Sequence, residues 1–432
     1  MATFYQYFVV LLISLFQVVF VYIKGYFLSI EFTLYPYLTQ KGFLPYKNIV
    51  DQHFPSLFFG TFSLPLLSSS SHIPLLILFL GILVGSNLLL FRYLKKTKTI
   101  YSLAWVALYS LLMCYFAGNV LWIEIVINIL ILISLNLSSS NGRHLKLISG
   151  LVISQAIIIR PTLAPAIFLL FFWLKEISLE GLLGAALGTI FSLYYLTHNH
   201  LTTDFFNLVI DFNSRVYSKV THPLPTLKQI LPVIFLLLLF LAGLIRQHKT
   251  LVFFIILLSL LSAYPRFGFE HLQPFVLVWI ILGAINQVLD KKHLLVCSLI
   301  FIFLSLYSLY KNQYGNYFYS PEVLELANKV SRIPSTEIYL FGTSDLIYPL
   351  SNKVPPQKTY IPSLSWYLNY YPIQKKLYES LESSSAPVIV DTQFSVDGIP
   401  LIESVQNVYL YIKMNYKLVS TDGRYEFYYK KI

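Results

Sequence analysis

Residues 73–94 read IPLLILFLGILVGSNLLLFRYL, an apolar run in which Arg92 is the one charged residue. A helix needs about 20 consecutive apolar residues to cross the hydrocarbon core of a bilayer. The run therefore predicts a membrane-spanning helix. Similar runs recur along the chain, at residues 4–28, 100–117, 119–137, 179–197, 229–246, 250–264, 271–289 and 292–310.

The composition indicates the same class of protein. Of the 432 residues, 56% are hydrophobic and only 12% are charged, whereas soluble proteins carry about 25% charged residues. Cys114 and Cys297 fall inside apolar runs and are expected to be small core residues rather than a disulfide or metal pair. We expect a polytopic α-helical membrane protein whose first run is retained as a span, because no Lys or Arg precedes it.

A further apolar stretch, Leu145–Trp173, is interrupted by Arg160–Pro161 and by Pro165. Proline breaks a helix and a charge favours a polar boundary, so the stretch predicts two short spans that meet at Arg160. The expected total is about eleven transmembrane helices, and those shorter than about 20 residues imply tilt or protein-buried ends.

Basic residues indicate how the chain crosses the membrane. With the N-terminus inside, every short cytoplasmic connection is basic, as the positive-inside rule requires. These connections contain Arg92–Lys98, Arg143–Lys146, Lys175, Arg246–Lys249 and Lys291–Lys292. The net charge of +11 therefore concerns topology, and no nucleic-acid-binding motif accompanies it. We expect a multi-pass protein of the plasma (inner) membrane, in contact with its lipids, with outer loops at about 29–72 and 198–228.

The character of the chain changes after about residue 311. Charged residues become frequent, and the pattern predicts a small α/β domain over residues 312–432, outside the membrane, after a membrane domain over 1–311. The expected elements are strands at Glu337–Phe341 and Pro387–Asp391, helices over 372–383 and 401–413, and a hairpin from Tyr416 to Tyr429 that turns at Asp422–Gly423.

The first outer segment, Glu31–Pro55, reads EFTLYPYLTQKGFLPYKNIVDQHFP and is expected to be a polar, aromatic loop. It contains Glu31 directly after the first span, followed by Asp51 and His53. Carboxylates near a membrane boundary can deprotonate a hydroxyl, while cations hold an anionic substrate. The other ionisable candidates on this side are Arg160, Arg215, Lys219, Arg266, Glu270 and His271.

Each candidate has a structural alternative. Asp51 can serve as a helix N-cap or turn residue, and Arg215 with Lys219 can form a solvated basic face. Arg266 and Glu270, four residues apart, can form an ion pair that caps the next span. Asp51 and His53 alone do not make a metal site, and no Asp-x-Asp occurs, so a metal-independent mechanism is favoured without excluding a divalent cation.

Two motifs and the layout carry a resemblance. The first motif is Gly42–Asn48 followed by Asp51–Pro55, and the second runs from Pro265–Arg266 through His271 to Pro274. In these features the chain resembles the glycosyltransferase C superfamily. It is most similar to the polyprenyl-phosphate-sugar-dependent transferases related to protein O-mannosyltransferases and lipid A aminoarabinose transferases.

The resemblance implies an integral membrane glycosyltransferase that moves a sugar from a polyprenyl-phosphate donor to an acceptor hydroxyl on a glycan, lipid or protein. It makes Glu31 the general base and Asp51 a second carboxylate. The substrate-binding residues would be His53, Arg160, Arg215, Lys219, Arg266, Glu270 and His271. The family often has paired acids where this chain has Ile30–Glu31, which leaves open whether Glu31 or Asp51 is the base. A lipid-linked glycan flippase and an inactive membrane scaffold remain the alternatives.

Overall fold

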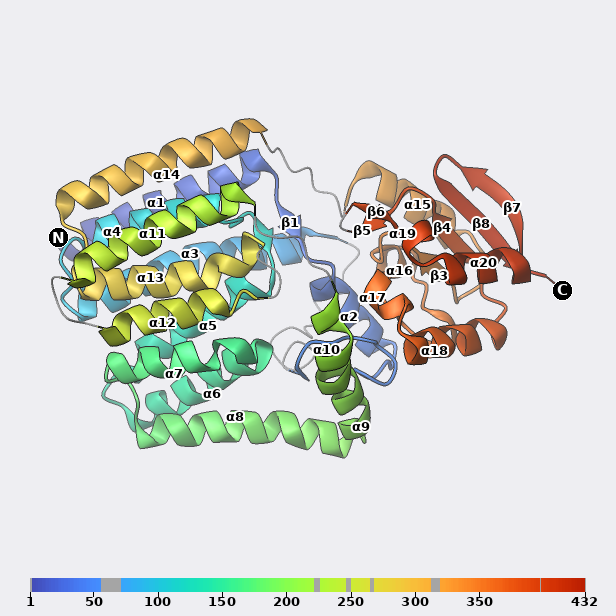
Figure 1. Cartoon of the computed structure of the whole chain (residues 1–432), viewed down its shortest axis with the longest axis horizontal. Helices are drawn as coiled ribbons and strands as arrows, with labels where there is room; N and C mark the ends of the chain where they lie inside the picture. The colour runs from blue at the N-terminus through green and yellow to red at the C-terminus, as the bar shows by residue number, and fades with distance from the viewer. Residues whose placement is uncertain are drawn as a thin grey trace. The chain divides into compact units, whose positions relative to one another are not determined.

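The computed structural model describes residues 2–55, 71–220, 226–245, 250–264, 268–311, 319–396 and 398–431 (Figure 1). The chain forms two compact units, and each is assembled from separate parts of the sequence. The helical unit comprises Met1–Leu28, Leu76–Leu193 and His222–Asn316, and the mixed unit comprises Ser29–Leu75, Tyr194–Thr221 and Tyr317–Ile432. The first predicted outer loop, and the second as far as Thr221, thus belong to the same compact unit as the C-terminal residues.

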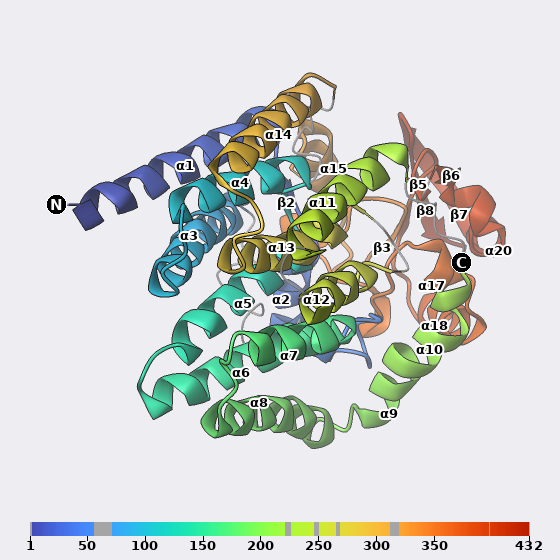
Figure 2. The ribbon, with the colours of Figure 1, turned by 60° about the vertical axis from the view of Figure 1, so that its left-hand side comes forward.

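The helical unit is a bundle in which α5 packs on α6, α4 on α1 and α14, and α12 on α7 and α13 (Figure 2). Its sequence is apolar nearly throughout, which is why these segments form helices that bury against one another. The apolar helices are α1 (Ala2–Lys24), α3 (Ile73–Lys96), α4 (Ser102–Tyr115), α5 (Ile123–Ser138), α6 (Arg143–Ile159), α7 (Ala164–Trp173), α8 (Leu179–His198), α11 (Leu227–Ile245), α12 (Thr250–Leu261), α13 (Gln273–Ile285) and α14 (Lys291–Lys311).

Membrane-type helices are confirmed, but not the full number of spans. Within the described residues, four helices are long and apolar enough to cross a membrane, namely α1, α3, α8 and α14. A fifth candidate is the pair formed by α6 and Pro161–Trp173, which bends by 117° at the break. The break falls at Arg160, as expected from the proline that follows it. The remaining apolar helices are shorter, and the expectation of about eleven spans stays a prediction.

A four-stranded sheet forms the centre of the C-terminal part of the mixed unit. Its strand order is β3 (Tyr339–Phe341), β4 (Val388–Asp391), β8 (Tyr425–Lys430) and β7 (Tyr416–Asp422). β3 and β4 are parallel and fully buried, whereas β8 runs antiparallel to both of its neighbours. The two predicted strands and the hairpin are confirmed, and Gly423 at the hairpin turn has the positive φ of 58° that glycine accepts without strain.

Helices surround this sheet. The expected helix over 372–383 is confirmed as α18 (Tyr371–Glu382), and the one over 401–413 is divided at Val405 into α19 (Leu401–Ser404) and α20 (Gln406–Asn415). The sequence analysis missed α15, which is capped by Ser320. The other described helices of this part are α15 (Pro321–Ser331), α16 (Ile347–Ser351) and α17 (Ser365–Leu368), and a small hairpin joins β5 (Ser395–Val396) to β6 (Ile399–Pro400).

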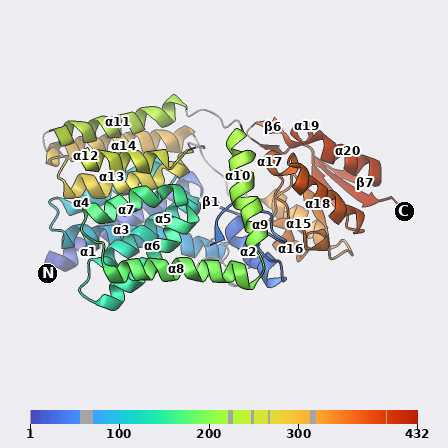
Figure 3. The ribbon, with the colours of Figure 1, turned by 60° about the horizontal axis from the view of Figure 1, so that its bottom comes forward.

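The prediction that Glu31–Pro55 is a loop is wrong for its first part. Residues Glu31–Gln40 form the helix α2, although Pro36 lies inside it. The helix buries every residue from Phe32 to Leu38 and contacts α16, and this burial outweighs the lost backbone donor at the proline. Part of the second predicted loop is helical as well, with α9 (Thr202–Phe205), a π-helix (Phe206–Asp211) and α10 (Phe212–Arg215) in succession (Figure 3).

Candidate functional site

Three carboxylates come together in the mixed unit, and we call Glu31, Asp51 and Asp345 the carboxylate cluster. Glu31 is the first residue of α2, Asp51 follows the turn after α2, and Asp345 lies in the turn after β3. The segment before Asp51 pairs with Tyr360 as an isolated parallel bridge. The Val50 N–H donates to the Tyr360 carbonyl at 2.9 Å, and the Tyr360 N–H donates to the carbonyl of Asn48 at 2.8 Å.

The turn between α2 and Asp51 explains the glycine and tyrosine of the sequence motif. Gly42 and Tyr46 both have positive φ, at 78° and 64°. The Leu44 N–H donates to the side-chain oxygen of Asn48 at 2.9 Å, which closes the turn. The Tyr46 hydroxyl donates to the carbonyl of His53 at 3.0 Å. The motif therefore builds a fixed support for Asp51 and His53.

Asp51 is 2% exposed and its two oxygens are occupied. The Tyr35 hydroxyl donates to Oδ2. Oδ1 accepts the backbone N–H of His53 at 2.6 Å and lies 2.7 Å from His53 Nδ1. Burial acts to raise the pKa of Asp51, but the His53 charge and these hydrogen bonds outweigh it and hold the pKa below its usual value. Asp51 is therefore an ionised acceptor that orients the imidazole of His53.

Glu31 occupies a different environment. It is only partly buried, and the Ser29 hydroxyl donates to its Oε2. Burial raises the pKa of the Glu31 carboxyl; the Ser29 hydrogen bond opposes this rise, and the negative charge of Asp51 adds to it. Of the two acids that the sequence singled out, Glu31 thus takes up a proton more readily than Asp51.

Asp345 is the third carboxylate, and the sequence analysis missed it. The Tyr360 hydroxyl donates to its Oδ2 at 2.8 Å. The pKa of Asp345 is raised to about 7: burial is the main cause, the Tyr360 hydrogen bond opposes the rise, and the charge of Glu31 adds to it. An acid shortly after the end of a buried strand was an available signal, because ligands of α/β sheets bind beyond the carboxyl ends of strands.

Aromatic rings and the second helical segment support the cluster. The rings of Tyr35 and Tyr360 lie 6.3 Å apart in an edge-to-face arrangement. The Gln52 N–H donates to the Tyr367 hydroxyl at 3.1 Å, and the Tyr367 ring stacks on Phe212 of α10 at 5.2 Å. Segments from three parts of the sequence therefore hold the residues next to Asp51 in place.

A second ionic group lies in the helical unit, and we call Glu124, Arg160 and His271 the arginine cluster. Glu124 is in the first turn of α5, Arg160 lies at the break after α6, and His271 is in a 3-10 helix (Glu270–Leu272) before α13. Arg160 Nη1 donates to Glu124 Oε1, and His271 Nδ1 lies 2.6 Å from the same oxygen. Arg160 also donates to the Ser262 carbonyl through Nε at 3.1 Å and through Nη2 at 2.7 Å.

The arginine cluster brings together two of the predicted substrate-binding residues, Arg160 and His271. Arg160 Nη1 and His271 Nδ1 lie 3.3 Å apart. The sequence analysis missed the anion between them, Glu124, whose side chain is only 2% exposed. An acid within the apolar run IEIVIN was a usable signal, because a charge at such a position normally faces a partner.

The other candidates have different surroundings. Arg215 is 77% exposed at its side chain and pairs with Asp211 at 2.6 Å, and Lys219 is exposed as well. Glu270 Oε1 lies 3.6 Å from His271 Nε2. The predicted residue Arg266 lies outside the described residues.

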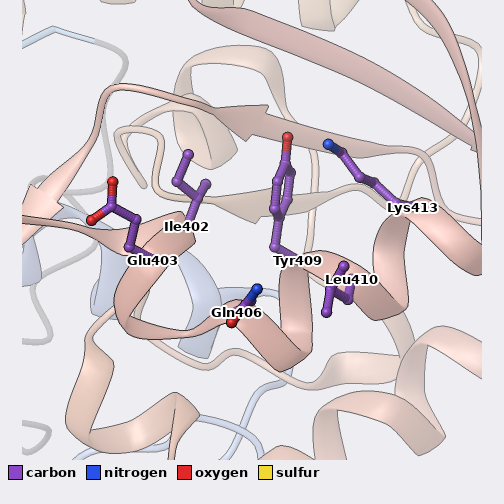
Figure 4. Close-up of a pocket in the computed structure, with 6 residues that line it drawn as sticks. All are labelled: Ile402, Glu403, Gln406, Tyr409, Leu410 and Lys413. Atoms are coloured by element: carbon purple, nitrogen blue, oxygen red, sulfur yellow. The ribbon is translucent and has the colours of Figure 1, made fainter.

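A metal centre or a surface hollow could also serve as a functional site, in place of the two ionic clusters. In the parts of the chain that the structure describes, no three His, Cys, Asp or Glu side chains are grouped so that they could hold a metal ion. A shallow hollow over α19 and α20 is lined by Ile402, Glu403, Gln406, Tyr409, Leu410 and Lys413 (Figure 4). Lys413 Nζ lies 4.4 Å from the centre of the Tyr409 ring and makes a cation–π contact with it. None of the predicted site residues lines this hollow.

No protein-family model matches the chain, and a search of curated proteins finds no match either. The chemistry of the two clusters is therefore the basis for a functional proposal.

Proposed function

We propose that the chain is an integral membrane glycosyltransferase that moves a sugar from a polyprenyl-phosphate donor to an acceptor hydroxyl, with Glu31 as the general base. The observation that carries the proposal is the contrast between Glu31 and Asp51. The negative charge of Asp51 acts on Glu31, and the pKa values of the two acids are displaced in opposite directions. Pairs of acids with diverging pKa values are typical of sites that need one proton acceptor and one fixed charge.

The hydrogen bonds favour different roles for the two acids. Both Asp51 oxygens already accept hydrogen bonds, so this residue is suited to orienting His53 rather than to taking a proton. Glu31 is less buried and accepts from Ser29 on Oε2. A base whose pKa is raised toward the working pH transfers protons more effectively than a strongly acidic carboxylate.

The proposed reaction is a displacement at the anomeric carbon of the donor sugar. Glu31 takes the proton of the acceptor hydroxyl, whose oxygen forms the new glycosidic bond. The bond between the anomeric carbon and the phosphate oxygen breaks, and the polyprenyl phosphate leaves with the electron pair. Cations stabilise that leaving group. The resemblance gives this role to Arg160, Arg266 and His271.

Transfer of a radiolabelled sugar in membranes that contain this protein tests the proposal. A set of polyprenyl-phosphate sugars serves as donors, and Glu31→Gln and Asp51→Asn are compared with the wild type. Glu379→Gln, at an acid that is 63% exposed, is the matched control. We expect transfer that Glu31→Gln abolishes and Glu379→Gln leaves intact. Wild-type activity in Glu31→Gln, or no transfer from any donor by folded protein, overturns the proposal.

A further inference from the structure

The turn that follows β3, Gly342–Asp345, contains two hydroxyl groups without hydrogen-bond partners in the described structure. These are Thr343 Oγ1 and Ser344 Oγ, both buried as atoms, and Thr343 as a whole is only 5% exposed. Buried polar groups in folded proteins nearly always have a partner, in the protein, in water or in a ligand. Two neighbouring exceptions therefore point to a molecule that completes their hydrogen bonds.

The turn is held rigidly. Gly342 has a φ of +75°, and a Cβ added there would come within 3.0 Å of the Cβ of Phe394. The Gly342 N–H donates to Ser363 Oγ at 3.0 Å, and the Ser363 hydroxyl donates to the Leu340 carbonyl at 3.2 Å. The unpartnered hydroxyls are thus fixed beyond the carboxyl end of a parallel strand, where α/β sheets bind ligands.

The turn is also continuous with the carboxylate cluster. Its last residue, Asp345, accepts the Tyr360 hydroxyl at 2.8 Å, and the Tyr360 ring contacts that of Tyr35, which donates to Asp51. A third unpartnered buried atom, Gln52 Oε1, belongs to the residue that follows Asp51. Polar atoms with unused hydrogen-bonding capacity therefore belong to residues directly next to Asp345 and Asp51 in the chain.

We propose that the turn Gly342–Asp345 is a sugar-binding subsite of the carboxylate cluster, in which Thr343 and Ser344 hydrogen-bond to the hydroxyls of a neutral sugar. Hydroxyl groups both donate and accept, so they can exchange hydrogen bonds with vicinal sugar hydroxyls in both directions. The catalytic meaning of the subsite rests on the proposed transferase function, whereas sugar binding itself does not.

Direct binding tests the subsite without any assay of transfer. Purified full-length protein, in a detergent that has no sugar headgroup, is titrated with free glucose, mannose, galactose and N-acetylglucosamine, and binding is followed by saturation-transfer NMR and calorimetry. We expect saturable binding of at least one sugar. Thr343→Val and Ser344→Ala should each weaken it about 3- to 10-fold, the usual effect of one neutral hydrogen bond.

The controls make the same chemical changes elsewhere. Thr421→Val and Ser420→Ala alter exposed hydroxyls on β7 and should leave sugar binding unchanged. Thr343→Val should not lower the melting temperature, because the hydroxyl that it removes has no partner in the described structure. Absence of saturable sugar binding in folded protein, or equal binding in the Thr343→Val, Ser344→Ala and control variants, overturns the subsite.

Transfer kinetics then distinguish the two sources of the sugar. If the subsite holds the acceptor, Thr343→Val raises the KM for the acceptor and leaves the KM for the donor unchanged; the reverse pattern places the donor sugar there. If Glu31→Gln retains full transfer while Thr343→Val loses sugar binding, the assignment of the base fails and the subsite stands. If Glu31→Gln loses transfer while Thr343→Val binds sugar as the wild type does, the subsite fails and the base stands.

Discussion

The carboxylate cluster and the arginine cluster both bury an acid, but they neutralise it differently. Asp51 and Glu124 are 2% and 1% exposed. Glu124 is met by the guanidinium of Arg160 and the imidazole of His271. Asp51 receives hydrogen bonds from a tyrosine, from a backbone N–H and from His53. One cluster holds a permanent cation, and the other contains none among its described contacts.

This difference determines which acid can change its protonation state. Arginine stays charged at any physiological pH, so it keeps its acid partner ionised and the pair acts as a fixed link. Burial and the neighbouring acids hold the pKa values of Tyr35 and Tyr360 well above their usual range, so both remain hydroxyl donors. With no permanent cation beside them in the described structure, Glu31 and Asp345 have raised pKa values and can take up a proton more readily.

The largest expected effect separates the two clusters by activity. Glu31→Gln should lower transfer by roughly 10²- to 10⁴-fold, the usual loss on removing a positioned base. It should not lower the melting temperature, because a neutral side chain is easier to bury than a carboxylate. Glu124→Gln should instead lower the melting temperature, since it leaves the charge of Arg160 uncompensated. Equal loss of stability in both variants would remove the distinction between the clusters.

The next effect concerns stability alone. Arg160→Met should destabilise the protein by about 3–5 kcal/mol, because it removes the permanent cation beside the buried carboxylate of Glu124. Arg215→Met is the matched control, since Arg215 pairs with Asp211 but is 77% exposed, and it should cost about 1 kcal/mol or less. Chemical unfolding in detergent, followed by circular dichroism, measures both. Similar values for the two variants would show that the arginine cluster does not tie its helices together.

A smaller effect is a change in pH dependence. The pKa of Asp345 is about 7 in the folded protein, above the value of about 4 in an unfolded chain. The folded state therefore binds more protons between these values, so Asp345 makes stability fall as pH rises through that range. Glu31 acts with the same sign, and Asp51, whose pKa is lowered, acts with the opposite sign at acidic pH.

Asp345→Asn removes this contribution. The difference in melting temperature between the variant and the wild type should therefore shift in favour of the variant as the pH rises from about 4 to about 7. Glu379→Gln, at an exposed acid, should keep the wild-type slope. Parallel curves for Asp345→Asn and the wild type would contradict the burial argument for this carboxyl.

The smallest effect is expected at the exposed cations. Lys219→Ala and Arg215→Ala should change the donor KM by roughly twofold or less, because surface side chains contribute little. Arg266→Ala should raise the donor KM more than either. A large effect of Lys219→Ala would instead extend the phosphate-binding surface to the segment that contains α10.

Local patterns predicted the parts of the fold that depend on local physics. The run PVIVD and the Asp422–Gly423 turn specified β4 and the final hairpin, and Arg160–Pro161 specified the bend between α6 and α7. The helix α2 was missed because Pro36 and its aromatic neighbours disfavour a helix locally, and only burial in the mixed unit stabilises it.

The candidate site likewise contains residues that local sequence patterns identified and residues that they did not. Glu31, Asp51 and His53 could be identified because they lie in one short polar segment directly after a span. Asp345 and Glu124 were missed because each joins its cluster through contacts between distant parts of the chain. Tyr360, for example, pairs with the backbone of Asn48 and Val50, and no local pattern encodes such a pairing.

The mixed unit is assembled from three separate stretches of the sequence, and this limits how many times the chain can cross the membrane between them. A compact unit built from residues 29–75, 194–221 and 317–432 must have all three segments on one side of the bilayer. The number of crossings between successive segments is then even. Among the described helices between Thr221 and Tyr317, α14 is long and apolar enough to cross the membrane. If α14 crosses the bilayer, at least one of the helices α11, α12 and α13 must cross it as well.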